Sequence, residues 1–128
     1  MGKVGAREGG EAVRFSLGIK PLSVNVAWQG RRFGTKEKKR YENLVAMLLP
    51  RASVSGEYFK VAYDFYVVNF AMTDADNLVK VLQDCIVKRG IVPDDRRIID
   101  YRIRKFPAKE PRIDVSIEAV ELLLTPQD

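Results

Sequence analysis

Apolar and polar residues alternate in several stretches of this chain, and that spacing predicts β-strands. A first strand begins at Val13 and ends or bends at Pro21. A longer β-rich run covers residues 58–70, and we expect it to be buried on both faces near its end. Two further alternating stretches, residues 99–103 and 113–119, predict two more strands.

Two other segments repeat apolar residues at intervals of three and four, as an amphipathic helix does. One runs over residues 35–49, where Thr35 is a favourable N-cap, and the other over residues 77–89, after which Gly90 is suited to end it. Residues 30–35, which follow the first strand and precede the first of these helices, predict a basic loop. This order of elements predicts an α/β (α+β) fold, in which a mixed β-sheet packs with two main helices.

Length and composition indicate one domain. The chain has 128 residues, and residues 1–11 lack any period, so we expect a mobile tail at 1–11 and one domain over 12–128. The single cysteine, Cys85, cannot form an intramolecular disulfide, and it lies in an apolar helical pattern that favours a structural thiol. Neither a signal peptide nor a membrane-spanning run is evident, so we expect a cytoplasmic protein with no membrane partner.

Charge narrows the chemistry further. A net charge of +5 favours an anionic partner, although a merely basic soluble protein would have the same charge. Histidine is absent, which excludes a histidine general base, a serine–histidine triad and imidazole zinc sites. Any metal chemistry must therefore use carboxylates, which favours Mg²⁺, or Mn²⁺ in its place.

A pair of aspartates, Asp74 and Asp76, follows the long β-rich run. In extended backbone their side chains share a face and lie roughly 7 Å apart. Two carboxylates so placed can hold one or two divalent ions, which lie about 4 Å apart in two-metal sites. The plainer alternative is that Asp76 caps the helix that begins there.

Lys80 is spaced four residues from both Asp76 and Asp84, which places all three on one helical face. A salt-bridged surface helix would explain this spacing equally well. A turn after Gly90 lets the adjacent pair Asp94-Asp95 double back toward the first aspartates, and a cation would relieve the repulsion between those carboxylates.

Basic residues gather on both sides of this acidic cluster. A solvated helix face would explain those in the first helix, but the acidic cluster favours contact with DNA. The predicted DNA-binding residues are Arg31, Arg32, Lys38, Lys39, Arg40, Arg96, Arg97, Arg102 and Lys105.

The spaced acidic motif resembles that of the RusA-type Holliday junction resolvases, a family of crossover junction endodeoxyribonucleases. The resemblance covers about residues 12–120, and it departs from the family at residues 69–73, where members often carry arginines. The matching positions are Pro21, Ser23, Asn25, Asp74, Asp76, Asn77, Lys80, Asp84, Gly90, Asp94, Asp95, Asp100, Tyr101, Arg102, Lys105 and Pro107.

The resemblance implies a Mg²⁺-dependent endonuclease that acts as a homodimer on four-way DNA junctions, in a bacterium or a bacteriophage. It implies that Asp74, Asp76 and Asp95 ligate the metal and that Lys80 is catalytic.

The resemblance also implies a supporting role for Asn77 and an accessory role for Asp94. The alternatives are a less selective flap or fork nuclease, a non-catalytic basic DNA-binding module, and a dimeric interaction protein.

Overall fold

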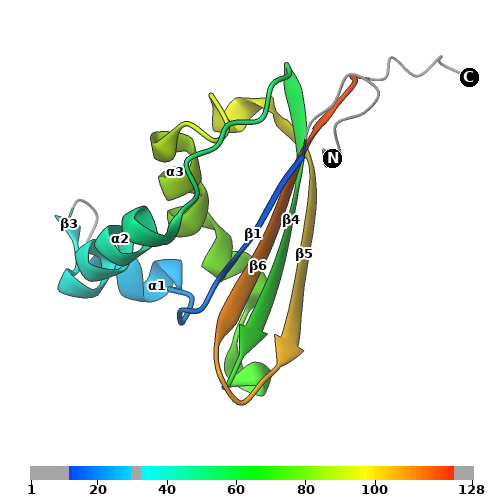
Figure 1. Ribbon diagram of the computed structural model, residues 1–128. Helices are drawn as coiled ribbons and strands as arrows, with labels where there is room; N and C mark the ends of the chain where they lie inside the picture. The colour runs from blue at the N-terminus through cyan, green and yellow to red at the C-terminus, as the bar shows by residue number, and fades with distance from the viewer. Residues whose placement is uncertain (1–11, 30–32, 123–128) are drawn as a thin grey trace, which may run out of the picture.

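The computed structural model describes residues 12–29 and 33–122, and in these ranges a sheet layer packs against a layer of helices (Figure 1). The predicted fold class is confirmed, with two main helices on a mixed sheet. The elements are β1 (Ala12–Leu17), α1 (Val24–Ala27), β2 (Trp28–Gln29), β3 (Phe33–Gly34), α2 (Lys36–Leu48), β4 (Tyr58–Val67), α3 (Val79–Arg89), β5 (Ile98–Pro107) and β6 (Arg112–Val120), with the 3₁₀ turns η1 (Phe70–Met72), η2 (Ala75–Leu78) and η3 (Asp95–Arg97).

The main sheet has the strand order β1-β6-β4-β5. β6 is antiparallel to both β1 and β4, whereas β4 and β5 are parallel. A parallel pair needs a crossover connection, and α3 with its flanking turns provides it. The acidic motif from Asp74 to Asp95 lies on this crossover, and Asp74, Asp76, Lys80 and Asp84 are exposed there.

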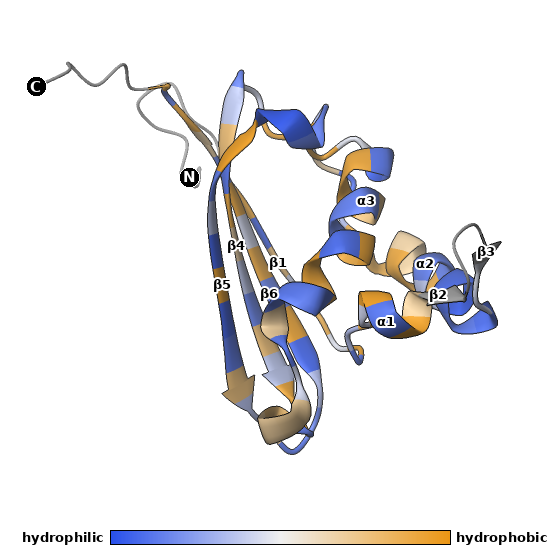
Figure 2. Cartoon of the chain, turned by 180° about the vertical axis from the view of Figure 1, so that it is seen from behind, coloured by the Kyte–Doolittle hydropathy of each residue, from blue (hydrophilic) through white to orange (hydrophobic). Residues whose placement is uncertain are grey.

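All three helices lie on one face of the sheet, and the core fills the space between the layers (Figure 1). β4 alternates between buried and half-buried residues along its whole length, with Phe59, Tyr63 and Phe65 fully buried under the helices. Bands of hydrophobic and hydrophilic residues alternate along the strands in the same way (Figure 2). Burying each such large side chain contributes roughly 1.5–3 kcal/mol.

The end of β4 differs from the sequence prediction. The strand ends at Val67, and Val68 beyond it is exposed, so the run is not buried on both faces there. The helices cover only one face of the sheet, and alternation therefore continues to the last residue of the strand. The chain then leaves the sheet and forms η1 and η2.

α2 begins at the predicted cap: Thr35 Oγ1 accepts a hydrogen bond of 3.1 Å from the backbone N–H of Lys38. Among the apolar residues spaced three and four apart in this helix, Tyr41 and Val45 are buried, whereas Leu44 and Leu48 are exposed. The predicted loop before it is wrong in part, because Phe33-Gly34 pairs with Trp28-Gln29 in a short antiparallel hairpin.

Some predicted features lie outside the described residues, namely the tail 1–11 and Arg31 and Arg32. Within the two described ranges, no helix combines the length and the apolar character needed to cross a membrane.

Candidate active site

Asp74 and Asp76 lie on the turn that leads from β4 into α3. Asp74 has extended backbone and precedes η2, and Asp76 lies inside that 3₁₀ turn. The extended geometry expected for this pair is therefore wrong beyond Asp74, because the backbone of Asp76 belongs to a 3₁₀ turn, in which side chains do not alternate as they do in a strand. Neither carboxylate caps a helix, and in the described ranges neither makes a hydrogen bond or an ion pair.

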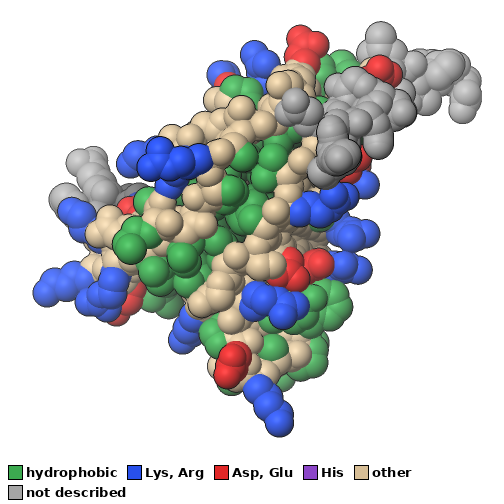
Figure 3. Space-filling model, viewed as in Figure 1, with side chains coloured by type: hydrophobic (Ala, Val, Ile, Leu, Met, Phe, Trp, Pro, Cys, Tyr) green, Lys and Arg blue, Asp and Glu red, His purple; other side chains and the backbone are tan. Residues whose placement is uncertain are grey.

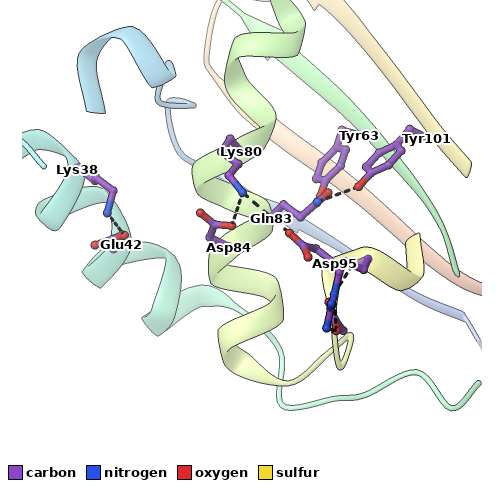
Figure 4. Close-up of polar contacts among 10 residues, drawn as sticks. Lys38, Glu42, Tyr63, Lys80, Gln83, Asp84, Asp95 and Tyr101 are labelled. Atoms are coloured by element: carbon purple, nitrogen blue, oxygen red, sulfur yellow. Dashed lines mark hydrogen bonds and ion pairs between the residues drawn. The ribbon is translucent and has the colours of Figure 1, made fainter. Parts of the chain in front are cut away.

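Lys80 lies in the first turn of α3, and its ammonium lies between two carboxylates (Figure 4). Lys80 Nζ is 3.3 Å from Asp84 Oδ1 and 4.0 Å from Asp95 Oδ2. The predicted pairing with Asp84 is confirmed, but the structure brings Asp95 to the lysine in place of Asp76. The side chains are 60%, 50% and 40% exposed for Lys80, Asp84 and Asp95, so these ion pairs contribute little stability and leave the ammonium open to a ligand.

The chain doubles back after α3, as the sequence predicted. Gly90 ends the helix with a φ of +92°, and its N–H donates to the carbonyls of Ile86 and Val87. L-residues rarely adopt this left-handed conformation, which explains the glycine. The reversal brings Asp95 back to the first half of the helix.

Asp94 and Asp95 have different surroundings. Asp94 caps η3 through a 2.9 Å hydrogen bond from the Arg96 N–H, and it pairs with the Arg96 guanidinium at 2.8 Å. Hydrogen bonds from the side chain and the backbone of Arg96 lower the pKa of Asp94 to about 2. Arg96 thus holds Asp94 in place, and the Arg96 guanidinium is itself paired with the cap of the η3 turn.

A chain of hydrogen bonds that sequence reasoning missed connects α3 to the sheet. Tyr63 Oη on β4 donates to Gln83 Oε1 at 2.9 Å, and Gln83 Nε2 donates to Tyr101 Oη on β5 at 2.9 Å (Figure 4). Gln83 is only 6% exposed. The sequence did carry a signal, because Gln83 interrupts the apolar face of the helix immediately before Asp84.

The donor set suits a hard divalent cation, since every candidate ligand is a carboxylate. However, the described ranges contain no group of three acidic side chains close enough to hold a metal ion between them. Asp74 and Asp76 are free to ligate, whereas Asp95 lies beside Lys80. The residues therefore fit Mg²⁺ in their chemistry. That Asp95 ligates the same ion as Asp74 and Asp76 stays a prediction.

The basic residues of α2 form an exposed stripe at the far side of the helical layer (Figure 3). Lys36, Lys39 and Arg40 are exposed and lie one helical turn apart or next to each other. Lys38 instead pairs with Glu42 at 2.6 Å. A groove of about 460 Å³ separates α2 from α3, and its basic wall includes Lys39, Lys88 and Arg89.

Arg102 and Lys105 of β5, which were both predicted to bind DNA, lie on opposite faces of the sheet. Arg102 is opposite Ala62 on the helix-free face, where it borders a depression of about 500 Å³ together with Arg14 and Lys60. Lys105 lies on the other face and donates to the carbonyls of Phe70 and Thr73. Its ammonium holds the turn that precedes Asp74.

An exposed lysine beside carboxylates, on a basic chain with an α+β fold, is the arrangement that a metal-dependent nuclease needs. The family model described as "Endodeoxyribonuclease RusA" matches residues 23–118, and the chain belongs to this family. The predicted resemblance is thereby confirmed.

Individual relatives agree with the family match. The chain is 28% identical over 93 residues to "Crossover junction endodeoxyribonuclease RusA" of Escherichia coli K12, which covers 70% of this chain and 78% of the relative. Proteins of the same name from Shigella sonnei and Enterobacteria phage 82 are each 27% identical over the same shares. These relatives come from bacteria and a phage.

Proposed function

We propose that this chain is a Mg²⁺-dependent endodeoxyribonuclease that resolves four-way DNA junctions by paired phosphodiester hydrolysis in recombination and repair. The observation that carries the proposal is the state of Asp74 and Asp76, whose exposed carboxylates have no partner in the described ranges. Capping was the plainer explanation of these residues, and the geometry does not support it. Family membership and the names of the relatives support the same conclusion.

In this proposal Asp74, Asp76 and Asp95 hold Mg²⁺, or Mn²⁺ in its place. A cation held there would supply a lower pKa for a water molecule and would screen the charge of the phosphate. Asn77 supports the carboxylates from the same turn, and Asp94 fixes the η3 turn that carries Asp95. Together these residues would form a cation-binding group beside the start of α3.

Lys80 supplies positive charge beside that group. Among the described residues its ammonium pairs only with exposed carboxylates, so a phosphate oxygen can replace Asp84 or Asp95 at modest cost. A fixed cation at this point stabilises the extra negative charge that develops on the phosphoryl oxygens during attack.

The DNA path in this proposal runs along the helical layer. The stripe of Lys36, Lys39 and Arg40 and the groove between α2 and α3 lead toward Asp84, which pairs with Lys80. Cutting both strands of a junction needs two such sites, so we propose that the chain acts as a homodimer. A reducing cytoplasmic setting agrees with the single cysteine.

One gel tests the proposal against its alternatives. A labelled four-way junction, a flap, a fork and a matched linear duplex are each incubated with the chain, with and without Mg²⁺. We expect metal-dependent cutting of the junction and not of the duplex. Binding without cutting would identify a DNA-binding module, equal cutting of flaps and junctions a less selective nuclease, and neither activity an interaction protein.

Replacing Asp74 or Asp76 by asparagine should abolish cutting and leave junction binding intact or slightly tighter. A neutral amide is a poor ligand for Mg²⁺, and one negative charge near the phosphates is lost. Single-turnover cleavage and gel-shift titration measure the two effects. Asp100→Asn is the matched control, because Asp100 is exposed on the helix-free face of the sheet. Wild-type turnover in both Asp74→Asn and Asp76→Asn would overturn the metal assignment.

A further inference from the structure

The turn that follows β4 exposes three large apolar side chains immediately before Asp74. Val68 is 62% exposed, Phe70 36% and Met72 79%. They lie two residues apart at the end of the sheet where β4 and β5 finish (Figure 1). Residues 68–73 carry no charged side chain.

The turn is fixed from β5. Lys105 Nζ donates to the carbonyl oxygens of Phe70 and Thr73 at 2.7 and 2.9 Å, and it lies 4.3 Å from the centre of the Phe70 ring. Thr73 Oγ1 also donates to the carbonyl of Asn69 at 2.7 Å. An apolar edge held in this way loses little conformational entropy when it binds a ligand.

We propose that this turn is a base-contacting edge, in which Met72 and Phe70 pack against an unstacked nucleobase of the DNA next to the phosphate to be cut. The inference rests on the proposed nuclease function. It adds an apolar contact that does not depend on the charge of the phosphates. This contact would distinguish branched DNA from a continuous duplex.

Chain geometry places this edge within a few nucleotides of the candidate metal ligands. The Cα atoms of Met72 and Asp74 are two residues apart and so at most about 7 Å distant, and those of Phe70 and Asp74 at most about 14 Å. One strand of duplex DNA advances roughly 3.4 Å per nucleotide. A base on Met72 would therefore lie within about two nucleotides of the bound phosphate, and one on Phe70 within about four.

The chemistry of the turn favours a base over other occupants. Phosphates need cations, and the ammonium that contacts this turn, that of Lys105, already donates to two carbonyls. Apolar and aromatic side chains, in contrast, wedge between base steps and stack on base faces. In the open form of a junction, whose arms are not stacked on one another, bases beside the branch point lack a stacking neighbour and cost less to unstack. Three side chains of one turn are also far fewer than the 20–30 residues a side, roughly, of a specific protein interface.

A fluorescent junction tests the inference. 2-Aminopurine, whose emission rises when it unstacks, is placed at each position that flanks the branch point, and the chain is added without divalent metal. We expect wild-type chain to raise the emission at one or more of these positions. Met72→Ser should remove most of that rise and weaken junction binding about tenfold, which lies toward the lower end of the effects of removing aromatic side chains that stack on bases.

Met47→Ser is the matched control. Met47 on α2 is 81% exposed, as Met72 is 79% exposed, so both substitutions remove one exposed methionine. Met47→Ser should keep the wild-type emission and affinity. Phe70→Ala gives a second variant, and it should act in the same direction as Met72→Ser.

The outcomes separate this inference from the function on which it rests. Wild-type chain that cuts the junction without any rise in emission would overturn the inference alone, as would a Met72→Ser variant that matches Met47→Ser. A Met72→Ser chain that sediments as a monomer where wild type is a dimer would also overturn it, because the turn would then be an interface between copies. Wild-type chain that neither binds nor cuts the junction would overturn the proposed function and this inference together.

Discussion

At the scale of single residues, Lys80 stands apart from the other lysines of the described ranges, because two carboxylates approach one ammonium that remains 60% exposed. An ion pair of this kind contributes about 0–1 kcal/mol to stability, which gives no structural reason for its position. A role in charge stabilisation at the reacting phosphate gives one.

Lys80→Ala should fold normally and cut at least about a hundredfold more slowly, which corresponds to about 2.7 kcal/mol of transition-state stabilisation. Lys80→Arg should not restore the full rate, since a planar guanidinium does not replace a compact ammonium. Single-turnover cleavage at saturating Mg²⁺ and a melting curve measure both properties. Lys20→Ala, at an exposed lysine between β1 and α1, is the control. A near-wild-type rate for Lys80→Ala would reduce the residue to a surface lysine.

At this scale the sequence predicted one contact of Lys80 and missed the other. The partnership of Lys80 with Asp84 followed from helical spacing and is confirmed. The approach of Asp95 in place of Asp76 did not follow, because it depends on the 3₁₀ turn around Asp76 and on the reversal at Gly90. No local rule fixes how far that reversal carries the chain.

The prediction for Cys85, a structural thiol, in contrast followed from the local sequence pattern alone. Cys85 packs against the core, and burial raises the pKa of its thiol to about 11. The thiol is therefore almost wholly protonated at neutral pH, which suits the expected structural role and not a nucleophile.

At the scale of elements, the buried amide of Gln83 fixes how α3 sits on the sheet. It accepts from Tyr63 Oη on the central strand and donates to Tyr101 Oη on the edge strand. Lys80 and Asp84 lie on the same helix on either side of it (Figure 4). A rotation of the helix would break both hydrogen bonds, so the amide positions the lysine.

Gln83→Leu should lower the free energy of unfolding by about 1–3 kcal/mol, because the buried Tyr63 hydroxyl loses its partner. Adding Tyr63→Phe to Gln83→Leu should recover much of that loss, since the unsatisfied hydroxyl is then removed as well. Urea denaturation of the two single variants and the double variant measures the coupling. A double variant whose loss is simply the sum of the single losses would show that the contact is not energetically coupled.

Elements were predicted well where one helix face or one strand face is buried, and less well where tertiary context decides. β4 and α3 have strong periods, and the sequence located both. The β2–β3 hairpin was missed because its strands are two residues each, too short for any period. The exposure of Leu44 and Leu48 also escaped prediction, because α2 meets the rest of the molecule through a narrower stripe than its apolar residues suggest.

The exposed basic stripe of α2 should contribute to the salt dependence of DNA binding. Replacing Lys36, Lys39 and Arg40 by alanine should weaken junction binding and reduce the slope of log K against log salt by up to roughly one unit per lost contact. Fluorescence anisotropy over a salt series measures the slope. Arg14→Ala/Arg102→Ala on the helix-free face is the contrasting variant. An unchanged slope in the α2 variant and a reduced one in the contrasting variant would place the DNA on the other face of the sheet.

At the scale of the whole molecule, the described chain has one lysine that lies beside the aspartates of the acidic motif, on one side of the main sheet. A four-way junction has two opposed strands to cut, and symmetric cuts by identical chains call for a two-fold axis. Only the crossover of α3 carries the site, so no second copy of it exists in the described ranges. The proposed reaction thus requires two chains.

Sedimentation should show about twice the chain mass at micromolar concentration. Mixing wild-type and inactive chains should show whether each subunit of the dimer makes one of the two cuts. Wild-type chain should convert a supercoiled plasmid with an extruded cruciform directly to linear product, because both cuts occur within one complex. Premixing it with an equal amount of Asp74→Asn chain, under conditions that exchange subunits, should make about half of all dimers mixed, and these should release nicked circles. Premixing with Asp100→Asn chain should still give linear product. A slower yield of linear plasmid without nicked circles, in the Asp74→Asn mixture, would mean that a single chain makes both cuts and that no functional dimer forms.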